Sequence, residues 1–487
     1  MIRHLIACCL PALLGGAAQA ASPPLSPSVL RYVRVQAPTV ILTHVRVIDG
    51  TGAAAMPDRN ITIENGRISH IDPGADVGAA ARATVLDLKG YSVMPGIVGM
   101  HNHLYYIARP GLEPDHSPAS EPPVLLPQMT FSAPRLYLAG GVTTMRTTGS
   151  VEPYADLNLR DQIDAGLLPG PHIDVTAPYL EGLNSYFIQM HQIKTAEEAR
   201  AFVSYWASVG VTSFKAYMNL TRAELKAAVE EAHKRGLKVT GHLCSITYPE
   251  AVEAGIDDLE HGFFVNTQLD SDKKPDVCSK SAGGETLKAM DPEGAEAGKL
   301  IQLLIAHHVA VTSTLPVFET DPAGRPPLQA RFLDALTPEA REAYLYSRER
   351  ALLHPDPDDA LLWAHELQLE HKFATAGGLL LAGPDPTGNG GVLPGFGDQR
   401  EIELLVEAGF TPLEAIRIAT LNGAIFEGKQ KSIGSIEVGK NADLVVMKGD
   451  PSQKISDIEN AEIVFKDGVG YDCEKLIHSV AGRFGEY

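Results

Sequence analysis

Apolar and polar residues follow a repeated order through the middle of the chain. An amphipathic helical stretch comes first, a glycine ends it, and a short apolar stretch with strand character follows. In the clearest repeat, Gly210 ends the helix before a strand at 211–215, and the apolar stripe of the helix consists of Phe202, Val203, Trp206 and Val209. Further repeats place strands at residues 237–242, 256–261 and 379–385. Strands that alternate with helices predict a parallel sheet of the α/β class.

A polar side chain stands at the end of each of these strands, namely Lys215, His242, His261 and Asp385. In a (β/α)8 TIM barrel the carboxyl ends of all strands converge on one mouth, so these four side chains are predicted to meet. An open doubly wound sheet is the alternative architecture. It would place the strand ends along a line and favour a glycine-rich phosphate loop, which we do not find in the sequence.

Short stretches of alternating polarity mark both ends of the chain. Residues 40–96 alternate and hold a hairpin signal at Asn65-Gly66, and strand-like stretches near the C-terminus flank a second signal at Asp467-Gly468. Neither end holds enough strands to close a core. We therefore expect a small β-sandwich domain formed by both chain ends, residues 37–95 plus 432–487, beside a TIM barrel over residues 96–431.

The first twenty residues have the order of a secretory signal peptide. A short basic start is followed by an apolar stretch from Leu5 to Leu14 and by the small-residue cleavage pattern Ala18-Gln19-Ala20. A buried N-terminal helix is the alternative, which Pro11 and the following glycines disfavour. The segment 1–20 is therefore predicted to direct export, with the mature protein periplasmic or extracellular.

The net charge of the chain disfavours two classes of partner, and the cysteine count limits the disulfides. Lys and Arg number 41 against 60 Asp and Glu in a chain of 487 residues, and the net charge of −19 disfavours nucleic acid and anionic membrane surfaces. After removal of the leader three cysteines remain, Cys244, Cys278 and Cys473. At most one disulfide can form, and the pairing, including Cys278 with Cys473, is left open. The oligomeric state is open as well, with a homo-oligomer as one alternative.

His101 and His103 add imidazoles to the predicted barrel mouth. They end the apolar stretch 92–100, and residues at i and i+2 of a strand face the same side, so both can bind one ion. Lys215 is unusual there, because an ammonium buried beside cations is costly and its pKa would fall. A neutral amine can react with carbon dioxide, and the resulting carbamate is an anion that can bridge two cations.

These residues carry a resemblance to a known family. Pro95-Gly-Ile-Val-Gly-Met-His101-Asn-His103, Lys215, His242, Leu259-Glu-His261-Gly and Ala-Gly-Pro-Asp385 resemble the amidohydrolase superfamily, in its binuclear type with a carbamylated lysine. The closing stretch 434–446 resembles that family's return into its β-sandwich. The chain departs from the family at Gly99, where an Asp is frequent, and at Pro384, where a Thr is frequent.

The resemblance implies a role for each residue. His101, His103 and Asp385 would hold the more buried metal, His242 and His261 the other, and carbamylated Lys215 would bridge them. The two divalent metals, expected to be zinc, would generate a bridging hydroxide that attacks a carbonyl carbon. Asp385 would act as general base and acid, delivering the proton to the leaving nitrogen. Tyr105, Tyr217 and Tyr248 follow ligands closely and are candidate substrate-binding residues.

The branches of the superfamily that look most similar are the prolidase-like dipeptidases and the ochratoxin-type amide hydrolases. We therefore expect a small-molecule substrate, an N-acyl amino acid or dipeptide-like compound, cleaved at its C–N amide bond. A lactonase or esterase with the same binuclear site is the first alternative, a mononuclear deaminase the second, and a secreted binding protein the third. Segments 110–127 and 266–298 follow strand ends and are candidates to cover the site.

Overall fold

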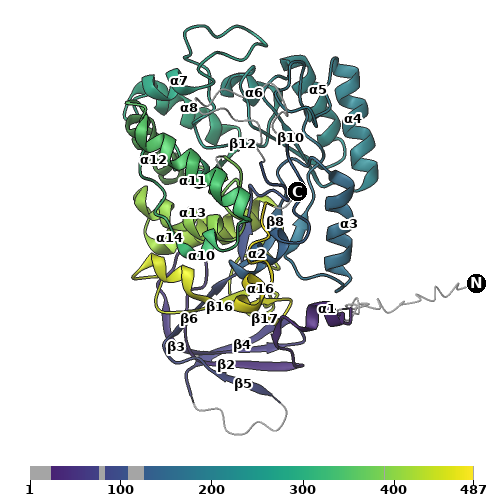
Figure 1. Cartoon of the computed structure of the whole chain (residues 1–487), viewed down its shortest axis with the longest axis vertical. Coiled ribbons are helices and arrows are strands. Elements are labelled where there is room, and N and C mark those ends of the chain that lie inside the picture. Colours follow the sequence, from purple (N-terminus) through teal and green to yellow (C-terminus); the bar gives the residue numbers. More distant parts are fainter. Residues whose placement is uncertain (1–22, 76–82, 108–124, 389, 486–487) are drawn as a thin grey trace, which may run out of the picture.

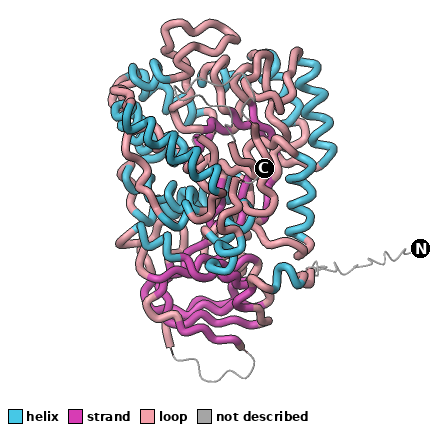
Figure 2. The backbone as a smooth tube through the Cα atoms, in the orientation of Figure 1, coloured by secondary structure: helices cyan, strands magenta, loops and turns pink. Residues whose placement is uncertain are grey.

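The computed structural model describes residues 23–75, 83–107, 125–388 and 390–485. It has a mixed α/β fold, with a β-sheet at one end and a ring of helices around further strands at the other (Figures 1 and 2). The predicted leader, residues 1–20, lies outside the described residues, as does most of the candidate covering segment 110–127. Among the helices that are described, none combines the length and the apolarity needed to cross a membrane.

The sheet at the end of the molecule combines both ends of the chain. Its strand order is β1-β17-β16-β15-β6-β2-β3-β4, with β5 paired to β2, and β15 pairs with β6 so that Leu444 lies opposite Pro95. Both predicted hairpin turns are confirmed, because Asn65-Gly66 and Asp467-Gly468 adopt the positive φ angles that such turns require. The described strands are β1 Val33–Val35, β2 Thr39–Val47, β3 Met56–Glu64, β4 Arg67–Pro73, β5 Thr84–Asp87, β6 Tyr91–Pro95, β15 Leu444–Lys448, β16 Ala461–Lys466 and β17 Val469–Asp472.

The remaining described strands are parallel, as predicted, and form sheets of three and five. The bridges Thr176↔Ser213 and Leu180↔Ala216 link the chain after β9 to β10. At the other side, the amide of Met100 after β7 donates to the Ala382 carbonyl of β14 at 2.9 Å. These strands are β7 Ile97–Gly99, β8 Val142–Arg146, β9 His172–Asp174, β10 Ser213–Ala216, β11 Lys238–Gly241, β12 Asp258–Glu260, β13 Ala310–Ser313 and β14 Leu380–Ala382.

Helices connect and surround the parallel strands. Threonine side chains cap several of them, as Thr221 caps α5, and Gly210 in the left-handed conformation ends α4 where the sequence predicts it. The helices are α1 Pro27–Leu30, α2 Ala133–Ala139, α3 Pro153–Asp164, α4 Ala196–Val209, α5 Arg222–His233, α6 Tyr248–Ala254, α7 Gly284–Ala289, α8 Ala295–Ala306, α9 Leu315–Phe318, α10 Ala330–Leu333, α11 Pro338–Leu353, α12 Asp359–Thr375, α13 Phe396–Glu407, α14 Pro412–Arg417, α15 Gly423–Phe426 and α16 Cys473–Ser479, with short η1 Ile418–Asn422 and η2 Ile455–Asn460.

A disulfide joins Cys244, just after β11, to Cys278 in the segment 266–298. Cys473 stays a buried thiol at the start of α16. The structure therefore settles the pairing that the sequence leaves open, and it does so without Cys473. The hydroxyl of Thr267 donates to the Cys244 carbonyl at 2.9 Å, which holds this segment beside the chain that follows His242.

His172 joins the parallel strands to the terminal sheet. Its Nδ1 lies 3.3 Å from Asp164 and its Nε2 lies 2.8 Å from Asp467 in the turn between β16 and β17. Burial and the charge of Lys466 oppose protonation, but the two carboxylates outweigh them and raise the pKa of His172 to about 9. The folded protein therefore holds this proton more tightly than the unfolded chain.

We expect this link to make stability depend on pH. Its contribution is fully present below the ordinary histidine pKa of 6.5 and is lost as the pH rises through about 9. Its size is on the order of 1 kcal/mol or less, because the side chains are partly exposed. Thermal unfolding midpoints across this window should fall more steeply for the wild type than for His172→Gln. The exposed His191→Gln is the control, and parallel curves for wild type and His172→Gln would contradict the prediction.

Candidate metal centre

The parallel strands deliver the six predicted ligands to one place. His101 and His103 follow β7, Lys215 lies in β10, and the other three follow β11, β12 and β14. His242 is half-buried and the other five side chains are buried. The close approach of two strand ends requires a glycine, since a Cβ on Gly383 would lie 2.2 Å from the amide nitrogen of His101.

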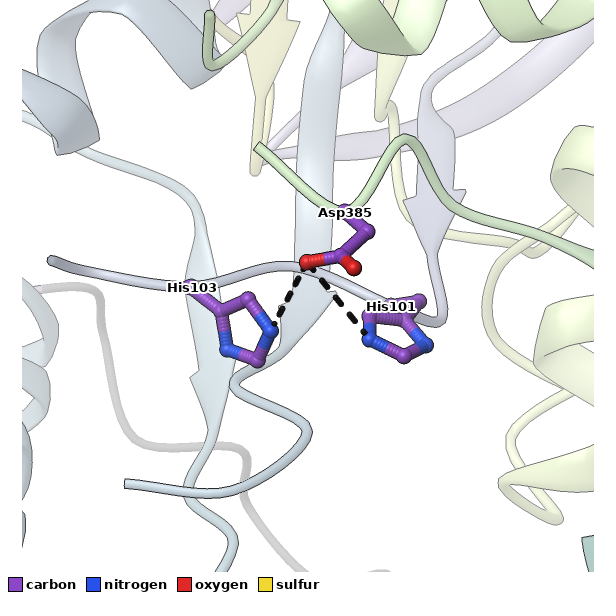
Figure 3. Close-up of side chains that lie close together, drawn as sticks. All are labelled: His101, His103 and Asp385. Atoms are coloured by element: carbon purple, nitrogen blue, oxygen red, sulfur yellow. Dashed lines mark ion pairs between the residues drawn. The ribbon is translucent and has the colours of Figure 1, made fainter. Parts of the chain in front are cut away.

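Asp385 stands between the two histidines of the His-x-His pair (Figure 3). Its Oδ1 lies 3.1 Å from His103 Nε2 and 3.8 Å from His101 Nε2. The three side chains can each offer one atom within 4.8 Å of the others, which is close enough to share a metal ion.

The other three predicted ligands adjoin this group. Lys215 Nζ lies 3.1 Å from His101 Nε2, and His261 Nδ1 lies 3.8 Å from the second oxygen of Asp385. The ring of His261 lies 4.4 Å from that of His242 and 4.5 Å from that of His101, measured between centroids. All six side chains thus form one contiguous cluster.

Hydrogen bonds turn the Nε2 atoms of two histidines, His101 and His103, into the cluster. The carboxylate of Glu260 accepts from His101 Nδ1 at 2.7 Å, and the carbonyl of Thr147 accepts from His103 Nδ1 at 3.2 Å. His261 Nδ1 lies 3.0 Å from the hydroxyl of Thr314, and its Nε2 is buried without a hydrogen-bond partner among the described residues. An unpartnered buried imidazole nitrogen is costly, and a metal ion would satisfy it.

The protonation states of the predicted ligands also suit the binding of metal cations. Burial and the charge of Lys215 lower the pKa of His101 to about 4 and that of His242 to about 3, so both are neutral ligands near pH 7. Burial lowers the pKa of Lys215 to about 8. Burial opposes ionisation of Asp385, but His101, His103 and Lys215 hold the pKa of its carboxyl well below the ordinary value. Neutral imidazoles with a carboxylate suit zinc and related divalent metals.

A buried ion-pair network supports His101 from behind. Arg146 Nη2 donates to Glu260 at 2.9 Å and to Asp258 at 3.2 Å, and all three side chains are almost fully buried. Burial opposes ionisation of Glu260, but Arg146 and His101 lower its pKa, so it stays an anion that accepts from His101. The sequence pattern marks neither residue as functional, although Glu260 ends β12 directly before His261 and Arg146 ends β8.

Tyrosines line the same region. The hydroxyls of Tyr105 and Tyr179 are 2.6 Å apart, and the ring of Tyr105 stacks on His103 with centroids 4.6 Å apart. Tyr217 lies against His242, with a centroid distance of 4.9 Å. The hydroxyl of Tyr248 instead donates to the Gly262 carbonyl at 2.7 Å, and its side chain is fully buried. Tyr179 follows β9 at a position that no sequence pattern marks.

The departure at Gly99 has a local explanation. A Cβ on Gly99 would lie 2.0 Å from the side-chain amide of Asn102, so Asn102 occupies the space that a larger residue at position 99 would need. Asn102 is itself fully buried between the two histidines. Position 99 therefore contributes no ligand here.

Comparison with known proteins agrees with the geometry. The model of the amidohydrolase family matches residues 92–349 and 368–469. No curated protein matches the chain in sequence. Similar solved structures include a Xaa-Pro dipeptidase with bound methionine (22% identity, TM-score 0.65, 89% of this chain and all of that one). Others are the A. niger ochratoxinase (18%, 0.60, 90% and 96%) and a bottromycin amidohydrolase (20%, 0.65, 94% and 95%). At these identities the structures show a shared fold.

Glu260 is expected to control metal affinity through His101. In Glu260→Gln an amide cannot accept from both His101 and Arg146, so the His101 tautomer is no longer fixed. Loss of such a partner typically costs about 10- to 100-fold in metal affinity. The measurement is zinc affinity by chelator competition, with Glu401→Gln as a control at a buried glutamate on α13. Equal zinc affinity in Glu260→Gln and the control would refute this role.

Proposed function

The chain belongs to the amidohydrolase family, and on that premise we propose that it is a metal-dependent hydrolase of the C–N amide bond in N-acyl amino acids or dipeptide-like compounds. Family membership makes it an enzyme of the hydrolase type. The observation that supports the proposal is the convergence of His101, His103 and Asp385 within 4.8 Å. Lys215, His242 and His261 adjoin them.

The proposal includes the architecture. Eight described parallel strands, with backbone links beside both β9–β10 and β14–β7, support a closed (β/α)8 TIM barrel over residues 96–431. The sheet built from both chain ends supports the β-sandwich domain of residues 37–95 plus 432–487. The Cys244–Cys278 disulfide supports export to the periplasm or beyond, since disulfides persist in oxidising compartments.

We assign the ligands as the sequence suggests. His101, His103 and Asp385 would hold one divalent metal, His242 and His261 the second, and Lys215, as its carbamate, would bridge them. When bound, such metals supply Lewis acidity that lowers the pKa of water and polarises a carbonyl. Lys215 suits carbamate formation because burial lowers the pKa of its amine to about 8, which increases the neutral, nucleophilic fraction near pH 7.

Asp385 is the proposed proton carrier. Its pKa is held below the ordinary value, so the carboxylate is ready to accept a proton from the attacking water. The same oxygen can then deliver this proton to the leaving nitrogen, which an amide bond requires because an unprotonated amine is a poor leaving group. The geometry supports this role because, among the described residues, Asp385 is the one carboxylate that contacts both histidines of the His-x-His pair.

Tyr105, Tyr179 and Tyr217 are the proposed substrate-orienting groups. Burial raises the pKa of all three hydroxyls, so they remain donors at neutral pH. Within the Tyr105–Tyr179 pair one hydroxyl donates to the other, which leaves one O–H for a substrate carboxylate or oxyanion. The similar structures include a dipeptidase and an ochratoxinase, and substrates with a free amino-acid carboxylate would suit this donor.

The function is tested with purified protein and a substrate panel. We expect hydrolysis of N-acyl amino acids and dipeptides, loss of activity on chelation, and recovery with zinc. Asp385→Asn should lower kcat by about 10²- to 10⁴-fold, the usual contribution of a general acid–base group. It should also lower the amount of bound metal. Metal analysis of this variant separates the two effects. Activity confined to lactones and esters would overturn the amidase proposal in favour of the same site cleaving C–O bonds.

The tyrosine pair predicts an asymmetric pair of variants. Of Tyr105→Phe and Tyr179→Phe, the one that removes the substrate donor should lower kcat/KM by about tenfold or more, as expected for a hydrogen bond to a charged group. The other substitution should lower kcat/KM by less, and the double variant should have the same kcat/KM as the less active of the two single variants. Tyr248→Phe is the control, which should lower the thermal midpoint without changing KM. A KM change in Tyr248→Phe alone would reverse the assignment.

A further inference from the structure

A cavity lies between α1, α2 and α16, apart from the metal ligands. Its volume is about 420 Å³, and it is lined by Arg31, Tyr32, Phe131, Arg135, Ser479 and Arg483 among others. None of these residues belongs to the metal cluster or to the tyrosines beside it. The space exceeds that of a single water molecule, about 30 Å³, by more than tenfold.

Three arginines gather at this cavity without an acid. Among the described residues, no carboxylate forms an ion pair with Arg31, Arg135 or Arg483, although the chain as a whole has 60 acidic residues against 41 basic ones. The guanidinium of Arg135 lies 4.0 Å from the centroid of the Phe131 ring, and that of Arg483 lies 5.4 Å from the same centroid. Like charges that line one cavity repel one another, and an anion between them would lessen that repulsion.

Arg135 is the buried member of the group. Only 7% of its surface is exposed, and its Nε has no hydrogen-bond partner within the part of the chain that is described. One terminal nitrogen donates to the Phe131 carbonyl. Burial and, more weakly, the charge of Arg31 lower the pKa of Arg135, whereas its hydrogen-bond partner, the Tyr32 hydroxyl, raises it.

Tyr32 reports the same positive environment. Burial opposes its ionisation, but hydrogen bonds with Ser479 and Arg135 and the charges of Arg135 and Arg31 lower the pKa of its hydroxyl. A group that becomes easier to ionise here indicates that the cavity favours negative charge.

We propose that this cavity is an anion site that binds a phosphate group, as inorganic phosphate or a phosphate monoester. Guanidinium groups bind tetrahedral oxyanions through paired N–H donors, and three of them from three elements suit a dianion better than a single carboxylate. Arg31 follows α1, Arg135 lies in α2 and Arg483 follows α16, so the ligand would also hold these three elements together. The proposal is independent of the hydrolytic function.

Calorimetric titration of the metal-loaded full-length protein tests this. Sodium phosphate and glycerol 3-phosphate are titrated separately, each against sodium chloride at equal ionic strength. We expect saturable binding, with the tighter ligand identifying the source of the phosphate group. The exposed Arg31→Gln and Arg483→Gln should each weaken binding about tenfold or more, the usual effect of losing a hydrogen bond to a charged ligand. Arg200→Gln, which removes an arginine on α4, should bind like the wild type.

A metal centre can also bind phosphate, so a second arm separates the two sites. His101→Ala with His103→Ala should abolish hydrolysis and leave phosphate binding intact, whereas Arg31→Gln should retain hydrolysis. Binding that disappears with the histidines and survives in Arg31→Gln and Arg483→Gln would overturn the proposal, as would an absence of saturable binding. Thermal midpoints of each variant confirm that it is folded.

Discussion

Balance of buried charge is the constraint on which this structure depends. Arg146 and Lys215 are fully buried cations, and Asp258, Glu260 and Asp385 are the buried carboxyl groups that face them. Removing one member would leave an uncompensated charge in a medium where that is very costly. Conversion of Lys215 from an ammonium to an anionic carbamate would tip this balance towards negative charge. The burial that disfavours protonation of the histidines would therefore leave them free to bind divalent cations.

The backbone delivers these groups at the strand ends, where the chain has left the ladder and can turn. His261 and Asp385 both adopt the left-handed conformation, with φ of 69° and 46°, which non-glycine residues rarely use. Such strain persists only where surrounding contacts fix it. Here the amide of Asp385 donates to the His101 carbonyl at 3.0 Å, and Thr314 holds the His261 ring. The strand ends thus fix both the position and the direction of the side chains that they present.

Sequence periodicity predicts the part of this site that is tied to strand ends. Lys215, His242, His261 and Asp385 could be placed together because each ends an apolar stretch after a helix-ending glycine. Tyr179 could not, because it lies in irregular chain after β9 and meets Tyr105 only through tertiary packing. The Cys244–Cys278 pairing was equally out of reach, because it depends on how a long segment folds back over the loop after β11. The shared terminal sheet was predictable, whereas its strand order was not.

The excess of acidic over basic residues makes the unpaired arginines at the cavity between α1, α2 and α16 notable. Many arginines and lysines of the described residues have an acidic partner, as Arg146 has Glu260, Arg400 has Glu319 and Lys429 has Asp174. In a chain so rich in carboxylates, an arginine that finds none is left so by its position in the fold. Three such arginines line one cavity, and only Arg135 and Arg483 lie over the ring of Phe131. An anionic ligand from outside the chain would supply the counter-charge that the fold does not.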